Sequence, residues 1–149
     1  MRCLNRQAMS SRTRPTILVV DDDPLFSFEL RGTLKRAGYT VLSAAKVCDA
    51  YSLLERQQID LAVVDLNLPD KSGLELIHTA RKTRTKLKIL AMTATLSDLH
   101  LEIAGYMGAD LAVRKFPGSQ TKDDFPTDEW TDAVQTALSC ALPPSPPFS

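Results

Sequence analysis

Short apolar runs alternate with segments of helical periodicity along this chain. Each run is rich in Val, Ile, Leu and Ala and is bounded by turn-forming or charged residues, as expected for strands buried in a parallel sheet. The predicted strands span Thr16–Val20, Tyr39–Ala44, Ile59–Val64, Lys88–Met92 and Asp110–Lys115.

Between these runs, apolar residues recur at helical spacing. In the first interval Phe26, Leu30 and Leu34 lie four residues apart. Asp23 is placed to cap this helix, and Pro24 suits its first position. The other predicted helices run from Val47 to about Gln57, from a Ser72 cap through Ala80, from Ser97 or Asp98 to Gly108, and from a Thr127 cap through Leu138, with Trp130 as a core anchor.

Strict alternation of strand and helix predicts an α/β fold with a doubly wound, five-stranded parallel sheet covered by helices on both faces. The expected arrangement is flavodoxin-like, (βα)5, with strand order 2-1-3-4-5. In this order the first and third strands are neighbours, and ligands bind outside the carboxyl ends of such strands.

Carboxylates stand at the ends of these two strands. Asp21 and Asp22 follow the first strand, and Asp65 follows the third. Carboxylates crowded together repel one another, and each then favours its protonated form. A hard divalent cation relieves this repulsion, because Mg²⁺ prefers a few carboxylate oxygens together with water and phosphate. The pattern therefore predicts a magnesium and phosphoryl site.

Composition narrows the class of protein. The 149 residues are 44% hydrophobic and carry no formal net charge, which fits one domain and gives no support for direct binding to nucleic acid or membrane. Three cysteines without metal-ligand spacing favour a reducing, cytoplasmic setting without disulfides. We expect a disordered basic leader over 1–14, a folded domain over 15–142 and a Pro-rich tail over 143–149.

A basic cluster follows the third predicted helix. Because the helix dipole favours cations at a carboxyl terminus, we interpret this cluster as a solvated helix end rather than a binding patch. Its members are Arg81, Lys82, Arg84, Lys86 and Lys88.

Four segments in the same order resemble the receiver domain of two-component response regulators. They are Ile17–Asp22 (ILVVDD), Leu61–Gly73 (LAVVDLNLPDKSG), Leu90–Ala94 (LAMTA) and Gly108–Lys115 (GADLAVRK). The resemblance extends over about Pro15 to Leu142, which covers nearly all of the chain outside its two terminal segments.

The resemblance implies a role for each acidic residue. Asp65 would be the phosphoacceptor, a carboxylate nucleophile that attacks a phosphohistidine of a sensor histidine kinase or histidine phosphotransfer protein. Asp22 would bind Mg²⁺ directly, Asp21 would bind it through water, and Asn67 would contribute its backbone carbonyl. The ion would carry much of the catalysis by neutralising charge.

The resemblance also assigns Thr93 and Lys115. The Thr93 hydroxyl would donate to one phosphoryl oxygen, and the Lys115 ammonium would pair with another. Both residues fall at the carboxyl ends of predicted strands, as the fold independently requires for this site.

Two positions depart from the family pattern. Receivers usually carry an aromatic residue three positions before the lysine, where this chain has Ala112. Without that ring, activation is expected to reach the last helix by another route. The family also places proline directly after the lysine, often with a cis peptide, whereas here Phe116 precedes Pro117. Either the cis bond has moved to Phe116–Pro117 or the loop follows another path.

The loop Phe116–Pro126 is long and polar. It either tailors a partner interface or is an insertion that a protein surface simply tolerates. Both interpretations stay open, as does the oligomeric state.

We expect a stand-alone response regulator that signals by contact with a downstream protein and is not an enzyme, apart from assisting its own phosphorylation and dephosphorylation. The alternative is an interaction scaffold with the receiver fold and no phosphorylation cycle. Two enzyme or cofactor classes fit poorly. A dehalogenase-type phosphatase would have an aspartate where Asn67 stands, and a flavodoxin would have a hydroxyl-rich phosphate loop where Asp21, Asp22 and Asp23 stand.

Overall fold

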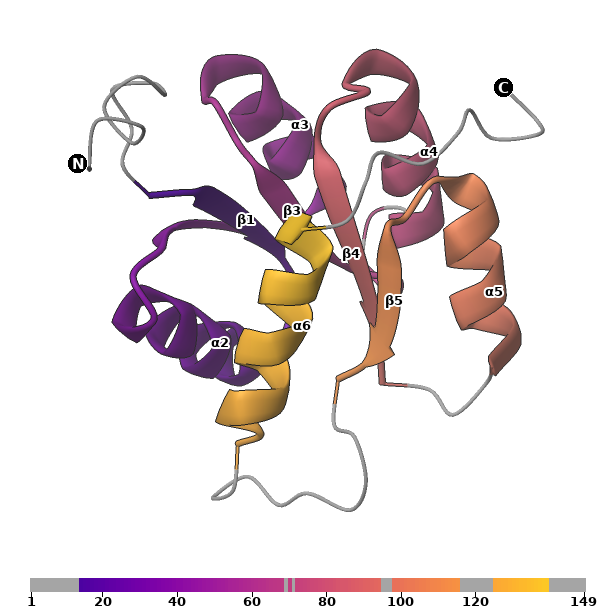
Figure 1. Ribbon diagram of the computed structural model, residues 1–149. Coiled ribbons are helices and arrows are strands. Elements are labelled where there is room, and N and C mark those ends of the chain that lie inside the picture. Colours follow the sequence, from indigo (N-terminus) through magenta and orange to yellow (C-terminus); the bar gives the residue numbers. More distant parts are fainter. Residues whose placement is uncertain (1–13, 69, 71, 95–97, 116–124, 140–149) are drawn as a thin grey trace.

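A central sheet of five parallel strands organises the molecule, a computed structural model that describes residues 14–68, 70, 72–94, 98–115 and 125–139 (Figure 1). The strand order is β2-β1-β3-β4-β5, as predicted. The strands are β1 (Thr16–Val20), β2 (Thr40–Ala44), β3 (Leu61–Asp65), β4 (Lys88–Thr93) and β5 (Leu111–Arg114). The helices are α2 (Pro24–Arg36), α3 (Val47–Arg56), α4 (Gly73–Thr83), α5 (Asp98–Met107) and α6 (Thr127–Ser139).

Helices cover both faces of the sheet (Figure 1). Because side chains alternate along a strand, Ile17 and Val19 of β1 face α2 and α6, while Leu18 and Val20 face the opposite helices, α3 and α4. Trp130 of α6 is buried against the first of these faces, so its predicted role as a core anchor is confirmed. The predicted three-layer architecture is confirmed as well.

Several predicted boundaries shift by a residue or two. Tyr39 does not begin β2, because its N–H donates to the carbonyl of Leu34 and closes the end of α2. Gly38 makes this closure possible through a φ of 103°, a conformation that glycine adopts without strain. β3 begins at Leu61 rather than Ile59, and β5 spans Leu111–Arg114.

Of the predicted helix caps, those at Asp23 and Thr127 differ in outcome. Asp23 caps α2, since its Oδ1 accepts from the N–H groups of Leu25 and Phe26 at 3.0 and 3.3 Å. The cap predicted at Thr127 is wrong. Thr127 is already helical and its hydroxyl donates to the Phe125 carbonyl, whereas a capping oxygen would accept from the helix.

Arg81 does not belong to the solvated basic cluster. It lies four residues after Ile77 on the face of α4 that meets the sheet, and it is 4% exposed. Its Nη2 pairs with Asp110 Oδ2 at 2.7 Å, and its Nε donates to the Gly108 carbonyl at 2.9 Å. This buried ion pair and hydrogen bond tie α4 to the segment between α5 and β5.

Some predictions fall outside the described residues. These are the leader over 1–13, the Pro-rich tail, residues 116–124 of the loop with its possible cis bond, and the start of α5 at Ser97. Within the described ranges, no helix combines the length and apolar character that crossing a membrane requires.

Candidate functional site

Three carboxylates meet at the carboxyl edge of the sheet. Val20 of β1 pairs in register with Val64 of β3, so the residues that follow, Asp21 and Asp65, emerge side by side. With Asp22 they offer oxygen atoms that all lie within 4.8 Å of one another. Asp21 and Asp65 are only 3% and 4% exposed, whereas Asp22 faces solvent. The predicted convergence of the three carboxylates is therefore present.

One ammonium group bridges the two buried carboxylates. Lys115 Nζ lies 2.9 Å from Asp21 Oδ2 and 3.1 Å from Asp65 Oδ2. Backbone groups hold the other oxygens, because Asp21 Oδ1 accepts from the N–H of Asp23 and Asp65 Oδ1 from that of Asn67, each at 3.0 Å. Each carboxylate thus has one oxygen fixed by the backbone and one turned toward the cation.

Neighbouring elements hold Lys115 in place just beyond β5. Its N–H donates to the Thr93 carbonyl at 2.9 Å, and its own carbonyl accepts from Trp130 Nε1 at 3.1 Å. Its ammonium lies 4.6 Å from the centre of the Phe26 ring, a distance suited to a cation–π interaction. The lysine is 5% exposed, so its charge acts in a largely desolvated site.

Burial dominates the protonation of this cluster. It raises the pKa of Asp21 from 3.8 to about 6, although the Asp23 N–H and the Lys115 ammonium favour the charged form. Burial by itself would lower the pKa of Lys115. The hydrogen bond and charge of Asp21, together with Asp65, outweigh burial and raise that pKa above 10.5. The lysine therefore stays charged.

The donor set suits a hard divalent cation. Asp21 Oδ2 is buried and forms no hydrogen bond beyond its ion pair with Lys115. The three acidic side chains bring more negative charge than one ammonium neutralises. Oxygen donors of this kind are those that Mg²⁺ selects, so these residues fit the predicted ion.

Thr93 and Asn67 lie at the same edge of the sheet. Thr93 ends β4 one residue after Met92, which pairs with Asp65, and it is 1% exposed. Asn67 is exposed, and its N–H reaches Asp65 as described above. The structure thus gathers at one edge all six residues named from the sequence: Asp21, Asp22, Asp65, Asn67, Thr93 and Lys115.

Two residues that shape the site have no role predicted from the sequence. Gly73 is one: a β-carbon there would lie 2.1 Å from the carbonyl oxygen of Asp65 and 2.8 Å from the Cα of Leu66. Only glycine permits this close approach, which lets the Gly73 N–H donate to the Leu66 carbonyl at 3.1 Å. The glycine at the end of the Leu61–Gly73 segment is the signal that could have found it.

Asp70 is the second. Its carboxylate accepts from the N–H of Val47 at 2.9 Å and from that of Cys48 at 3.2 Å, so it caps α3 from a distant loop. The helix has no cap of its own, since Lys46 at its N-cap makes no side-chain bond. No local pattern signals a cap supplied from more than twenty residues away.

Comparison with known proteins decides the family. The profile of the response regulator receiver domain matches residues 17–121. This chain belongs to that family. Among curated relatives of the receiver, TorR of Escherichia coli K12, a transcriptional regulatory protein of the TorCAD operon, is 31% identical over 99 residues, 66% of this chain and 43% of TorR. TcrX, a probable transcriptional regulatory protein of Mycobacterium tuberculosis, is 35% identical over 79 residues, 53% of this chain and 34% of TcrX. The receiver thus spans less than half the length of either relative.

Solved structures agree with this assignment of the receiver. A response regulator from Chloroflexus aurantiacus superposes with a TM-score of 0.74 at 26% identity, over 85% of this chain and 98% of that one. TrrA of Thermotoga maritima, solved in complex with Mg²⁺-BeF, gives 0.70 at 28% identity over 83% and 98%. A Burkholderia pseudomallei regulator with a phosphorylated aspartic acid and a calcium ion gives 0.65 at 28% over 83% and 74%. The predicted fold and family are both confirmed.

Proposed function

We propose that this receiver accepts a phosphoryl group on Asp65 from a phosphohistidine of a sensor histidine kinase or histidine phosphotransfer protein. It then signals through contacts with a downstream protein. The observation that carries the proposal is the buried Asp65 carboxylate, fixed by Lys115 at 3.1 Å beside Asp21. A nucleophile held at the edge of a sheet beside a permanent cation is suited to phosphoryl transfer, which depends mainly on positioning and charge.

The carboxylates of Asp21, Asp22 and Asp65 would hold Mg²⁺, together with the backbone carbonyl of Asn67. When bound, the ion supplies positive charge to phosphoryl oxygens that would otherwise be repelled by the acidic cluster. The Mg²⁺-BeF complex of TrrA and the phosphorylated aspartic acid of the Burkholderia regulator support this choice by analogy.

In the proposed step a carboxylate oxygen of Asp65 attacks phosphorus and a new O–P bond forms. The P–N bond of the phosphohistidine breaks and its electron pair returns to the imidazole nitrogen. That nitrogen takes up a proton from water, so the leaving group is a neutral imidazole. Lys115 stabilises the negative charge on the phosphoryl oxygens, and the Thr93 hydroxyl donates to one of them. The chain acts as a signalling protein whose chemistry is its own phosphorylation and later hydrolysis.

One observation favours a second candidate function. Ala112 lies half-buried in β5, three residues before Lys115, and carries no ring to couple the site to the neighbouring helices. A receiver without that coupling could serve as an interaction scaffold with no phosphorylation cycle. Failure of wild type to take up a phosphoryl group, from a small donor and from a cognate phosphodonor alike, would favour the scaffold.

The test uses phosphoramidate, a small donor with the P–N bond of a phosphohistidine, and measures intact mass with and without Mg²⁺. Wild type should gain the mass of one phosphoryl group only with Mg²⁺, and Asp65→Asn should gain none. Asp23→Asn is the matched control, because Asp23 is exposed beside the site and asparagine also caps helices. Equal adducts on wild type and Asp65→Asn would overturn the proposal.

A further inference from the structure

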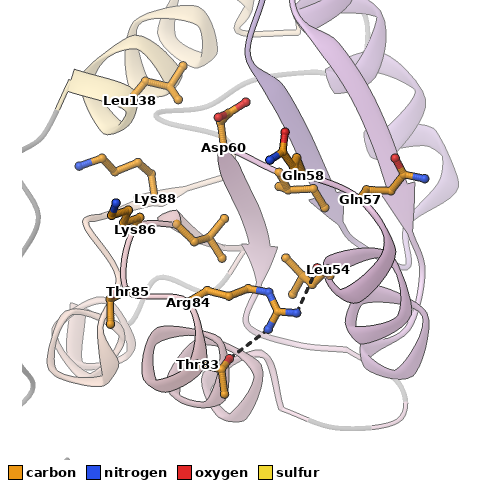
Figure 2. A pocket seen from close by; sticks show the side chains of 12 residues that line it. Leu54, Gln57, Gln58, Asp60, Thr83, Arg84, Thr85, Lys86, Lys88 and Leu138 are labelled. Atoms are coloured by element: carbon orange, nitrogen blue, oxygen red, sulfur yellow. Dashed lines mark hydrogen bonds between the residues drawn. The ribbon is translucent and has the colours of Figure 1, made fainter. Parts of the chain in front are cut away.

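A concave site lies at the amino-terminal edge of the sheet, opposite the acidic cluster. It is a groove of about 670 Å³ between the carboxyl ends of α3 and α4, lined also by the segments that enter β3 and β4 and by Leu138 of α6 (Figure 2). Strands of five residues place it about 17 Å from the phosphoacceptor edge. The proposed phosphorylation makes no use of this groove.

The groove is lined by an excess of positive charge. Arg84, Lys86 and Lys88 contribute three cations, whereas Asp60 is the one acidic residue among the described residues that line it. The Asp60 carboxylate is already engaged, because its Oδ2 accepts from the N–H of Thr16 at 2.7 Å. The opposite pole of the molecule holds the acidic cluster, so a chain without net charge has two poles of opposite sign.

Arg84 is held in place between the carboxyl ends of α3 and α4. Its Nη2 donates to the carbonyl of Leu54 near the end of α3, and its Nη1 donates to Thr83 Oγ1, both at 3.1 Å (Figure 2). A guanidinium has five N–H donors in a planar fork that matches a carboxylate. These two bonds use only two of the five, so other N–H donors can bind a ligand. A cation fixed in this way loses little side-chain entropy when it binds an anion.

Apolar side chains and amides complete the lining. Leu54 and Leu87 are almost fully buried beneath the cations, and Ile59 is half-buried. Gln57 and Gln58 stand on the wall formed by the segment after α3 (Figure 2). Amide side chains both donate and accept, which suits the main chain of an extended peptide.

Charge and chemistry select among possible occupants. None of the described lining residues is aromatic, so nucleobases would find no stacking surface. The terminal segments of this chain are also unsuitable on charge. Residues 1–13 carry arginines and no acidic side chain, and residues 140–149 carry no acidic side chain either. An acidic segment of a partner protein matches both the cations and the apolar lining.

We propose that this groove binds an acidic, partly apolar peptide segment of a partner protein. Carboxylates of the segment pair with Arg84 and Lys86, and its apolar side chains pack on the half-buried Ile59 and Leu138. Because the groove and Asp65 lie at opposite edges of the sheet, the partner stays bound while the receiver is phosphorylated and dephosphorylated. The groove therefore serves constitutive docking, independent of the proposed phosphorylation.

The probe is a fluorescein-labelled peptide of alternating glutamate and leucine, titrated with the full chain and followed by fluorescence anisotropy. Wild type should bind it, with affinity falling as salt rises. Lys86→Glu should weaken binding about five- to tenfold, since an attraction becomes a repulsion at an exposed site. Lys35→Glu is the matched control, because Lys35 is exposed at the end of α2 on the other face of the sheet and should leave binding unchanged.

Two further measurements separate binding in the groove from charge attraction elsewhere on the surface. A glutamine–leucine peptide should not bind, and in NMR spectra the amide signals of Leu54 and Gln57 should shift with the acidic peptide. Lys86→Glu should unfold at the wild-type temperature and take up phosphoryl groups normally. The proposal is overturned if wild type does not bind the acidic peptide, if Lys86→Glu binds it equally well, or if a single-stranded oligonucleotide binds more tightly.

Discussion

The Asp21 carboxylate is buried, and the charge of Lys115 does not fully compensate for the hydration that it loses. Its raised pKa, about 6 against 3.8, means that the folded chain holds the proton more tightly than the unfolded chain does. The associated stability is complete below about pH 4 and is lost as the pH rises through 6. At neutral pH, without Mg²⁺, an ionised Asp21 therefore destabilises the fold and stores free energy that a cation can release.

Asp21→Asn should therefore raise the free energy of unfolding in Mg²⁺-free buffer at pH 8 by about 1–3 kcal/mol. Asparagine keeps an acceptor for the Asp23 N–H and removes the charge. Urea denaturation at several pH values measures the effect, which should grow between pH 4 and 6 and then level off. A variant less stable than wild type at pH 8 would contradict this account of the cluster.

Gly73 tests how closely the loop after β3 must pack on the phosphoacceptor strand. Gly73→Ala forces a methyl group against the Asp65 carbonyl and should cost about 1–3 kcal/mol of stability while slowing phosphorylation. Gly105→Ala is the control: beyond the neighbouring residues and backbone of its own helix, no atom lies within 4 Å of the added methyl, and alanine favours the helix. Denaturation and phosphoramidate uptake should separate the two variants, and similar behaviour would remove the argument for close packing.

Periodicity predicts the type of every strand and helix, because burial on one or both faces sets the spacing of apolar residues. What it cannot predict depends on contacts between distant residues. Tyr39 has the composition of a strand residue, but the left-handed turn at Gly38 uses its N–H to close α2. Arg81 resembles its charged neighbours in sequence because its partner, Asp110, lies 29 positions away.

The acidic cluster is predictable for a related reason. Two adjacent parallel strands with carboxylates at their ends bring those carboxylates together in any doubly wound sheet. No such rule predicts the residues that hold the surrounding loops and helices in place. Asp70 resembles an ordinary turn residue in sequence, and only the folded chain shows that it serves the first turn of α3.

At the level of elements, Asp70 links the loop beyond Asp65 to α3. Asp70→Ala removes the acceptor for Val47 and Cys48 and should lower stability by about 1 kcal/mol. Hydrogen exchange at these two amides should accelerate in the variant. Asp49→Ala, an exposed acid in the same turn of the helix, is the comparison, and equal protection in both variants would show that Asp70 is not the cap.

For the whole molecule, the proposed Mg²⁺ site predicts that the stability of the fold depends on the ion. An ion that binds only the folded chain raises the unfolding temperature as its concentration rises above the dissociation constant. The rise should be larger at pH 8 than at pH 5, because protonation of Asp21 competes with the ion.

Asp22→Asn should lose most of this Mg²⁺ effect, while its metal-free unfolding temperature stays near that of wild type because Asp22 is exposed. Thermal unfolding followed through the single, buried Trp130 reports both quantities. An equal Mg²⁺ response in Asp22→Asn and wild type would place the ion elsewhere.

The proposed phosphorylation depends most directly on Asp65 being the residue that carries the phosphoryl group. Borohydride reduces an acyl phosphate to an alcohol, so treating the phosphorylated chain converts the modified aspartate to homoserine, which peptide mass spectrometry can locate. We expect homoserine at position 65, formed only with Mg²⁺ and a phosphodonor. Homoserine at Asp21, Asp22 or Asp23, with position 65 unchanged, would contradict it.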